Sequence, residues 1–295
     1  MSTVATSFTE EFVEVSGIKL HCMNNGSGKL ILFLHGFPEF WYVWREQLKE
    51  FGKDYHALAP DMRGYNLSDK PKPISEYFMP RLLADVKALV DRYSQGKKVI
   101  LVAHDWGGAV AWNFAIAHPE CLEKLVIINS PHPATFLREL KNNREQRKAS
   151  SYMILFASGL GEVALKAGDY RRLKEAIFEK SANPAIFSEA DKKAYQLAWS
   201  QPGALAGGLN YYKAFFQQAL KRLIGDKQKI GLRVSVPTLV IWGEKDTALL
   251  TGNLNGLEKF VPNLTIKRIA DGTHWVIHEQ PELVNRYIRE FIEET

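Results

Sequence analysis

Residues 97–107 read Lys97-Lys-Val-Ile-Leu-Val-Ala-His-Asp-Trp-Gly107, an apolar run that ends in a carboxylate between small residues. Ala103 stands two residues before Asp105 and Gly107 two residues after it, a frame typical of a sharp strand-to-helix elbow. Such an elbow usually presents a serine nucleophile, and here an acid takes that place. The stretch therefore predicts an α/β fold with an exposed carboxylate at the end of a buried strand.

The carboxylate changes the chemistry that this elbow can support. A serine that attacked saturated carbon would form an ether, which activated water cannot reopen. A carboxylate forms an alkyl ester instead, and water can attack the carbonyl of that ester. Asp105 is also ionised at neutral pH without a neighbouring base. The elbow thus predicts displacement at saturated carbon followed by ester hydrolysis, and the alternative is an ordinary turn whose Asp caps the next helix.

Strand and helix patterns alternate along most of the chain. We expect strands at 12–15, 18–22, 30–34, 56–59, 99–102, 125–128, 238–242 and 264–269, with helices near 42–51 and 80–93 and after the elbow. The stretch between the sixth and seventh strands is polar and helical in rhythm. This order predicts an α/β core of residues 1–131 and 234–295, a mostly parallel sheet with helices on both faces, and an inserted helical cap of residues 132–233.

The composition narrows the class of protein. A chain of 295 residues can hold one large α/β domain with an insertion. Its net charge of +5 comes without a run of five like charges, so nucleic acid is not an expected partner. The middle segment is enriched in Lys and Arg, which indicates solvated helix faces or, alternatively, anionic substrates. Two cysteines, no basic-then-apolar leader and no long apolar run predict a cytoplasmic protein without a membrane span.

Hydrolysis of an ester on Asp105 requires a base, an acid that orients it, and oxyanion donors. His274 follows the last predicted strand, and Asp246 follows the strand before it. Because the carboxyl ends of parallel strands meet at one edge of a sheet, both side chains are expected to reach the elbow. The backbone N–H groups of Phe37 and Trp106 are the predicted oxyanion donors.

Other polar residues compete for these roles. Glu244 is an alternative orienting acid, and His104 adjoins the nucleophile but is expected to point away from it. His278 lies four residues after the predicted base, a spacing that can chelate a metal on a helix. Pro281 interrupts that helix, and no further ligands complete a set, so neither a metal nor a cofactor is expected.

Several segments carry a family resemblance. They are His35–Arg45, Asp61–Pro71, His104–Gly108 and the loops that hold Asp246 and His274. Together they resemble the epoxide hydrolases of the α/β-hydrolase fold, over nearly the whole chain. The order nucleophile, acid, histidine is also that of α/β-hydrolases. The resemblance implies that an epoxide and water are the small-molecule partners and that a vicinal diol forms through an ester on Asp105.

In that family two cap tyrosines hydrogen-bond the epoxide oxygen. The resemblance assigns these positions to Tyr152 and Tyr212, with Tyr211 as a rival for the second. Opening the ring creates an alkoxide, whose conjugate acid is far weaker than a phenol, so donation from tyrosine becomes favourable as the C–O bond breaks.

Two other functions use the same scaffold. Haloalkane dehalogenases share the His-Asp-Trp-Gly pattern and bind halide with the Trp after the nucleophile, which leaves Trp106 ambiguous. Their second halide donor is often an Asn where this chain has Phe37, which has no side-chain donor, and fluoroacetate dehalogenases typically carry Arg in place of Trp106. A non-catalytic ligand receptor is the third possibility, because a fold alone does not fix function. The tyrosines and these departures favour an epoxide. Oligomeric state, substrate size and stereochemical preference are not indicated.

Overall fold

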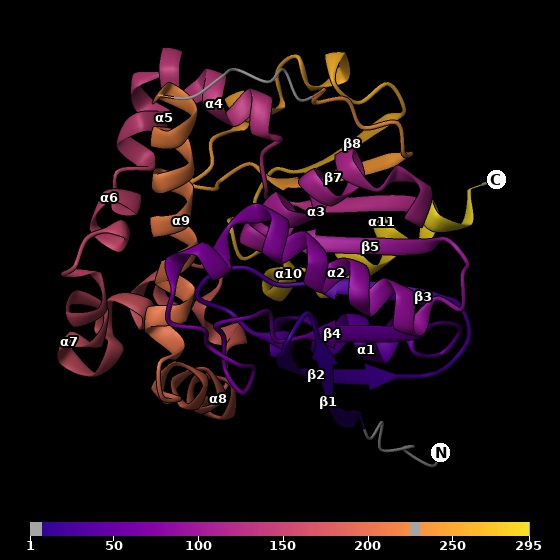
Figure 1. Cartoon of the computed structure of the whole chain (residues 1–295), viewed down its shortest axis with the longest axis horizontal. Helices are drawn as coiled ribbons and strands as arrows, with labels where there is room; N and C mark the ends of the chain where they lie inside the picture. The colour runs from indigo at the N-terminus through magenta and orange to yellow at the C-terminus, as the bar shows by residue number, and fades with distance from the viewer. Residues whose placement is uncertain (1–7, 225–230, 295) are drawn as a thin grey trace.

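An eight-stranded sheet forms the centre of the protein in a computed structural model that describes residues 8–224 and 231–294 (Figure 1). The strand order is β1-β2-β4-β3-β5-β6-β7-β8. β1 and β2 are antiparallel to their neighbours, and the remaining pairs are parallel. The bounds are β1 (Thr9–Val15), β2 (Ile18–Asn25), β3 (Leu30–Leu34), β4 (His56–Pro60), β5 (Val99–His104), β6 (Leu122–Ile128), β7 (Thr238–Gly243) and β8 (Leu264–Ile269). The predicted fold class is confirmed.

Helices cover both faces of the sheet because its central strands are apolar on both sides. In β3, Leu32 packs toward one cluster with α2 and α3, and the next side chain, Phe33, packs toward another with α1 and α11. The helices of this core are η1 (Trp41–Trp44), α1 (Arg45–Phe51), η2 (Ile74–Tyr77), α2 (Met79–Tyr93), α3 (Asp105–Ala117), η3 (Pro119–Cys121), η6 (Thr251–Leu254), η7 (Leu257–Lys259), α10 (Val276–Glu279) and α11 (Pro281–Glu293).

A helical insert separates β6 from β7, as the sequence predicts. It consists of α4 (Pro133–Asn142), α5 (Arg144–Ala149), α6 (Tyr152–Ala157), α7 (Gly161–Lys174), η4 (Glu175–Glu179), η5 (Pro184–Ile186), α8 (Glu189–Ser200) and α9 (Ala204–Ile224). Figure 1 shows these helices gathered at one end of the sheet. α7 contains left-handed backbone at Gly168, Asp169 and Tyr170, so it is two short helices joined by a kink.

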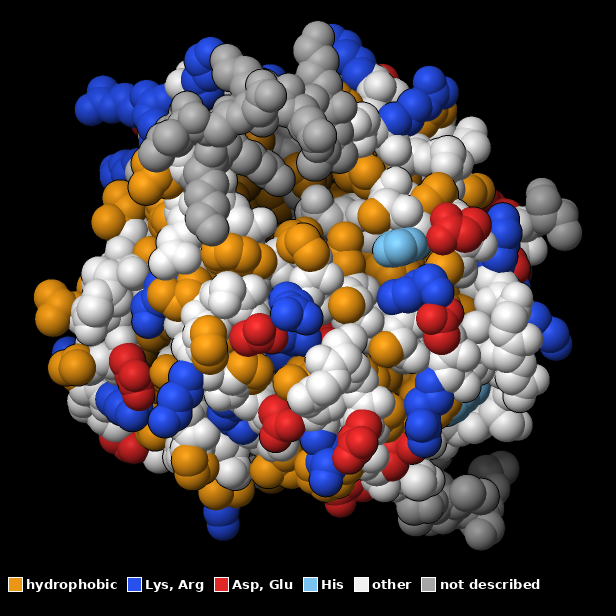
Figure 2. All heavy atoms as spheres, in the orientation of Figure 1, with side chains coloured by type: hydrophobic (Ala, Val, Ile, Leu, Met, Phe, Trp, Pro, Cys, Tyr) orange, Lys and Arg blue, Asp and Glu red, His pale blue; other side chains and the backbone are white. Residues whose placement is uncertain are grey.

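The surface of the insert is more apolar than that of the core. The large apolar side chains exposed on the insert are Leu137, Ile154, Leu160, Val163, Leu197, Phe216 and Leu220, whereas the described core exposes only Phe12 and Leu67 in this way. Figure 2 shows apolar side chains along the left edge, where Figure 1 places α6 and α7.

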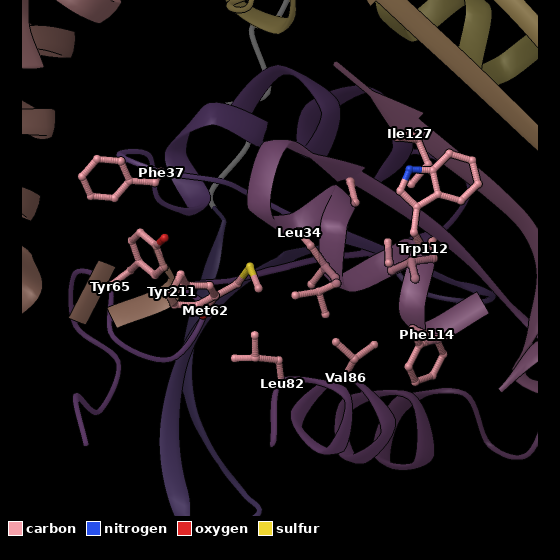
Figure 3. Close-up of a cluster of buried hydrophobic side chains, with 14 of the residues drawn as sticks. Leu34, Phe37, Met62, Tyr65, Leu82, Val86, Trp112, Phe114, Ile127 and Tyr211 are labelled. Carbon is pink, nitrogen blue, oxygen red and sulfur yellow. The ribbon is translucent and has the colours of Figure 1, made fainter. Parts of the chain in front are cut away.

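One apolar cluster runs from the core into the insert. Figure 3 shows it extending from Trp112 and Phe114 on α3, past Leu34 on β3, to Phe37 and Tyr211. Tyr211 belongs to α9, so the insert packs on the same core that supports the elbow.

A close backbone contact fixes where α9 lies. A Cβ on Gly207 would stand 2.2 Å from the carbonyl oxygen of Gly64, so only glycine fits there. Gly64 itself has φ +90°, which also favours glycine. One turn later the Tyr211 hydroxyl donates to the carbonyl of Arg63 at 2.9 Å. This contact brings α9 down onto the carboxyl edge of the sheet.

The structure extends several predicted elements. β6 begins at Leu122, before the predicted 125, because Leu122 pairs with Val99 of β5. Its polar residues Glu123 and Lys124 interrupt the apolar run that the prediction followed. The predicted helix at 42–51 begins as the 3₁₀ turn η1. Among the described residues, we find no helix with the length and apolar character needed to cross a membrane.

Candidate functional site

Asp105 lies at a strained turn between β5 and α3. Its φ of +47° falls in the left-handed region that side-chain residues rarely adopt. The turn is tight enough that a Cβ on Gly107 would stand 2.3 Å from the carbonyl oxygen of Leu34. The N-cap position of α3 belongs to His104, and the Asp105 carboxylate instead accepts a bond from another loop. The helix-cap interpretation of Asp105 is therefore wrong.

The two oxygens of the Asp105 carboxylate have different surroundings. Oδ1 accepts the backbone N–H of Phe37 at 2.8 Å. Oδ2 faces Nε2 of His274 at 3.6 Å. Trp106 is the second residue of α3, where a backbone N–H has no acceptor within the helix. The carboxylate thus lies at a helix N-terminus, whose N–H groups and dipole favour negative charge.

His274 is oriented by Asp246, as the order of strands predicts. The Nδ1 atom of His274 lies 2.7 Å from Oδ2 of Asp246. The other carboxylate oxygen of Asp246 accepts the backbone N–H groups of Ala248 and Leu249 at 2.8 and 2.9 Å. Burial acts to raise the pKa of Asp246, but the charge and hydrogen bond of His274 and these N–H donors hold it below its usual range. Asp246 is therefore an ionised, fixed partner for the imidazole.

The charge on His274 follows from its two carboxylate neighbours. Burial acts to lower its pKa, whereas Asp246, by charge and hydrogen bond, and then Asp105 raise the pKa to about 9. At neutral pH the resting site therefore holds an imidazolium between two carboxylates.

Two cavities meet at the elbow. One has a volume of about 420 Å³ and the other about 910 Å³, and Asp105, Tyr152 and Tyr212 line both. The rings of Tyr152 and Tyr212 lie 6.2 Å apart at 75°. Burial and the charge of Asp105 raise the pKa of both tyrosines, so both carry their protons at neutral pH. The Trp106 indole contacts Tyr212 at 5.1 Å between ring centroids.

Tyr211 differs from Tyr212 in where its hydroxyl points. The hydroxyl of Tyr211 is bound to the Arg63 carbonyl, as described above, and its ring lines only the smaller of the two cavities at the elbow. The geometry therefore favours Tyr212 as the partner of Tyr152.

Asn129 is a site residue that the sequence analysis missed. It follows β6 at the same sheet edge, with φ +40°. Its Nδ2 donates to Oδ2 of Asp246 at 2.8 Å, and its Oδ1 accepts the backbone N–H of Gly243 at 2.9 Å. A polar residue directly after a buried strand was the available signal.

Glu39 is the second residue that was missed. Its buried carboxylate lies 2.9 Å from Nδ1 of His104 and 2.8 Å from Nε2 of His278, and it accepts the Tyr195 hydroxyl of α8 at 3.2 Å. Burial acts to raise the pKa of Glu39, but bonds to the two histidines hold it well below the usual range. His104 also contacts the backbone carbonyl of His274 at 2.9 Å. This buried group thus braces the loop that carries the candidate base.

The competing residues are engaged elsewhere. Glu244 accepts a bond from Arg268 at 2.9 Å rather than from the imidazole. His278 points to Glu39 and His274 to Asp246, so the pair does not converge on a shared metal position. Within residues 8–224 and 231–294, no group of three or more His, Cys, Asp or Glu could hold a metal ion.

Comparison with known proteins agrees with this architecture. Residues 29–281 match the family model described as the alpha/beta hydrolase fold. The chain is 40% identical to the AB hydrolase superfamily protein YfhM of Bacillus subtilis, over 96% of this chain and 97% of that one. It is 36% identical to Epoxide hydrolase 2 of Caenorhabditis elegans, over 98% of this chain and 81% of that one.

A solved structure is similar over the same extent. It is a variant of an epoxide hydrolase from Bacillus megaterium, complexed with its product, a naphthyloxy-propanediol. The sequence identity is 34% and the TM-score 0.87, covering 96% of this chain and 100% of that one. The chain therefore belongs to the α/β-hydrolase fold family, in which it is most similar to epoxide hydrolases.

Proposed function

We propose that this protein is an epoxide hydrolase that converts an epoxide and water to a vicinal diol through an ester on Asp105. The observation that carries the proposal is that four side chains lie around the space where the two cavities meet. Asp105 faces His274 on one side, and the protonated hydroxyl-bearing rings of Tyr152 and Tyr212 line both adjoining cavities. Relatives named as epoxide hydrolases support it. In this assignment residues 1–131 and 234–295 form the catalytic core, and residues 132–233 form the cap.

In the first half-reaction, Oδ2 of Asp105 attacks an oxirane carbon. Phe37 N–H binds Oδ1, whereas Oδ2 faces Nε2 of His274 at 3.6 Å, and we assign Oδ2 as the attacking oxygen. The C–O bond of the ring breaks, and its electron pair moves to the oxygen while Tyr152 and Tyr212 donate to it. The oxygen of the opened ring takes up one proton. The imidazolium of His274 supplies this proton, by way of the tyrosines or solvent, and becomes neutral.

In the second half-reaction, His274 acts as the base. Ester formation removes the negative charge of Asp105, which is one of the causes that raise the pKa of His274. The imidazole can then stay neutral and accept a proton from water as that water attacks the ester carbonyl. The N–H groups of Phe37 and Trp106 stabilise the oxyanion. When the ester bond breaks, the leaving oxygen takes the second proton of the attacking water from the new carboxyl group, which releases the diol. Asp105 and the imidazolium are restored.

A parallel assay tests the reaction class. Styrene oxide and 1-bromobutane are offered to the wild-type protein and to the Asp105→Asn variant, and diol and bromide are measured. We expect diol from the wild type alone and no bromide release. Bromide release would identify a haloalkane dehalogenase instead, and neither product would support a non-catalytic receptor.

Isotope labelling tests the covalent route. In a single turnover in oxygen-18 water with enzyme in excess, the label should enter the Asp105 carboxylate, because water attacks the ester carbonyl and the diol keeps the former Asp105 oxygen. Label found first in the diol would overturn the ester intermediate and leave direct hydration by water.

A further inference from the structure

Gln146 is a buried amide of the insert that reaches into the core. It belongs to α5, and its side chain has no exposed surface. Its Nε2 donates to Oγ of Ser150 and to the carbonyl of Ala248, both at 2.8 Å. Its Oε1 accepts the backbone N–H of Leu250 at 2.9 Å and Nδ2 of Asn253 at 2.8 Å. The amide therefore uses both of its donors and both lone pairs of its acceptor, and three of these four bonds cross from the insert to the core.

The core segment that Gln146 binds is the loop that holds Asp246. This loop joins β7 to η6 and contains neither strand nor helix, so side chains must satisfy its backbone polar groups. The carboxylate of Asp246 accepts the N–H groups of Ala248 and Leu249. Gln146 binds the carbonyl of Ala248 and the N–H of Leu250. Gln146 thus holds the stretch 248–250 whose N–H groups fix the orienting acid.

The remaining bond of Gln146 leads to Tyr152. Its partner Ser150 lies at the end of α5, and α6 begins at Tyr152, two residues later. The backbone carbonyl of Ser150 accepts the N–H of Met153 at 3.1 Å, which ties it to the first turn of α6. One amide therefore links the loop of the orienting acid to the start of the helix that presents a candidate proton donor.

Gln146 lies behind the wall of the site. The larger cavity is lined by Ala149 and Tyr152 of the insert and by Ala248 and His274 of the core. Gln146 is not among the described residues that line either cavity at the elbow. It can affect a bound substrate only through the segments to which it is hydrogen-bonded.

We propose that Gln146 is a positioning residue that holds the Asp246 loop and the start of α6 in one fixed arrangement. In this arrangement His274, oriented by Asp246, and Tyr152 act on the same bound epoxide. An apolar side chain in place of the amide leaves four buried polar groups without a partner, so the loop must shift to satisfy them. This inference rests on the proposed epoxide hydrolysis and adds to it a residue that does not touch the substrate.

The hydrogen bond between His274 and Asp246 provides a readout that needs no substrate. The proton on Nδ1 of His274 lies in a charge-assisted bond of 2.7 Å and should give a strongly downfield line in the proton NMR spectrum. His274→Gln identifies the line by removing it. In Gln146→Met, a substitution of similar size, the line should broaden or move upfield because Asp246 is displaced. An unchanged line would overturn the proposal.

Steady-state kinetics on styrene oxide provide the second readout. Gln146→Met should lower kcat by about ten-fold, since a small displacement of reacting groups is costly. KM should change by less than about three-fold, because the cavity walls keep their side chains. An unchanged kcat would overturn the proposal, and so would a higher KM alone, which would place the effect of Gln146 in substrate binding.

Gln47 offers a matched control. It is a fully buried glutamine of α1, and its Nε2 donates to Oδ1 of Asn285 of α11 at 2.8 Å. Gln47→Met should lower the stability to urea and leave both kcat and the downfield line unchanged. Equal changes of kcat and of the line in Gln47→Met and Gln146→Met would show a general loss of stability and refute the positioning role.

Asn253→Ala keeps the test decisive if Gln146→Met does not fold. It removes one of the four bonds of Gln146 and should change kcat and the downfield line in the same direction by a smaller amount. Wild-type values of both in Asn253→Ala would then refute the proposal.

The two readouts separate this inference from the function on which it rests. Diol formation by the wild type, with an unchanged downfield line in Gln146→Met, would refute the positioning role and leave epoxide hydrolysis standing. If the wild type forms no diol, the proposed function fails. A displaced line in Gln146→Met would then still show that Gln146 positions the orienting acid.

Discussion

The carboxyl edge of the sheet and the helical insert position their site residues by different means. At the sheet edge, hydrogen bonds between loops hold Asp105, Asp246 and His274, with distances of 2.7–2.8 Å to their fixed partners. In the insert, Tyr152 and Tyr212 are held by edge-on contacts with aromatic rings such as Phe156, which lies 5.2 Å from the first and 5.1 Å from the second.

This difference separates the chemistry from the selection of substrate. Directional hydrogen bonds keep reacting groups within a narrow geometry, as catalysis requires. Aromatic packing tolerates a change of side-chain shape more readily, and the insert also exposes most of the large apolar side chains. We expect the sheet edge to set the reaction and the insert to set which epoxide reaches it.

The strongest test of the division between sheet edge and insert is to remove the base at the sheet edge. In the proposed mechanism, His274→Gln should lower turnover by about 10³-fold or more and trap the ester, because attack by Asp105 on the oxirane needs no base whereas hydrolysis of the ester does. Mass spectrometry after exposure to styrene oxide should find one substrate mass added on the peptide that contains Asp105. Asp105→Asn is the control that should gain no mass. An unmodified His274→Gln protein would argue against a covalent intermediate.

The second prediction concerns the pH dependence of the free energy of unfolding, which we expect the residues at the sheet edge to control. The pKa of His274 is raised from 6.5 to about 9 in the folded protein. Its contribution to the free energy of unfolding is therefore complete below pH 6.5, declines as pH rises, and is lost above about pH 9. The full contribution is about 3 kcal/mol.

Urea unfolding between pH 6 and pH 9.5 measures this contribution. The stability difference between the wild type and His274→Gln should shrink as pH rises through this range, because the variant has no group that titrates at that position. A difference that stayed constant with pH would show that the imidazolium does not stabilise the fold. Tyr152 and Tyr212 do not interfere, since their pKa values are raised further above the range.

The smallest predicted effects come from the insert, where substitution of single tyrosines tests which of them donate to the epoxide oxygen. Tyr152→Phe and Tyr212→Phe should each lower kcat by about 10²-fold, because each removes one donor to the oxygen on which charge develops. Tyr211→Phe should cost about 1 kcal/mol of stability, since it removes the bond to the Arg63 carbonyl, with little change in kcat. The measurements are steady-state kinetics on styrene oxide and urea unfolding. A larger kcat loss in Tyr211→Phe than in Tyr212→Phe would reverse the assignment.

Much of the core was predictable because its signals are local. An apolar run followed by a small-x-acid-x-small frame specifies a strand and an elbow, and parallel strands bring Asp246 and His274 to the same edge as Asp105. The limits of β6 were not predictable from the same signals, since the polar residues Glu123 and Lys124 lie inside a strand that is defined by the pairing of Leu122 with Val99 and of Lys124 with Ile100 of β5. Asn129 and Glu39 were missed because their role depends on partners more than 60 residues away in sequence.

The sequence by itself determined the fold class, the acidic elbow and the order of the residues at the sheet edge, because strand periodicity and turn chemistry depend on neighbours in the chain. Only the tertiary structure decided between Tyr211 and Tyr212. Adjacent helical residues point about 100° apart, and the contact of Gly207 with Gly64 sets which of them faces Asp105.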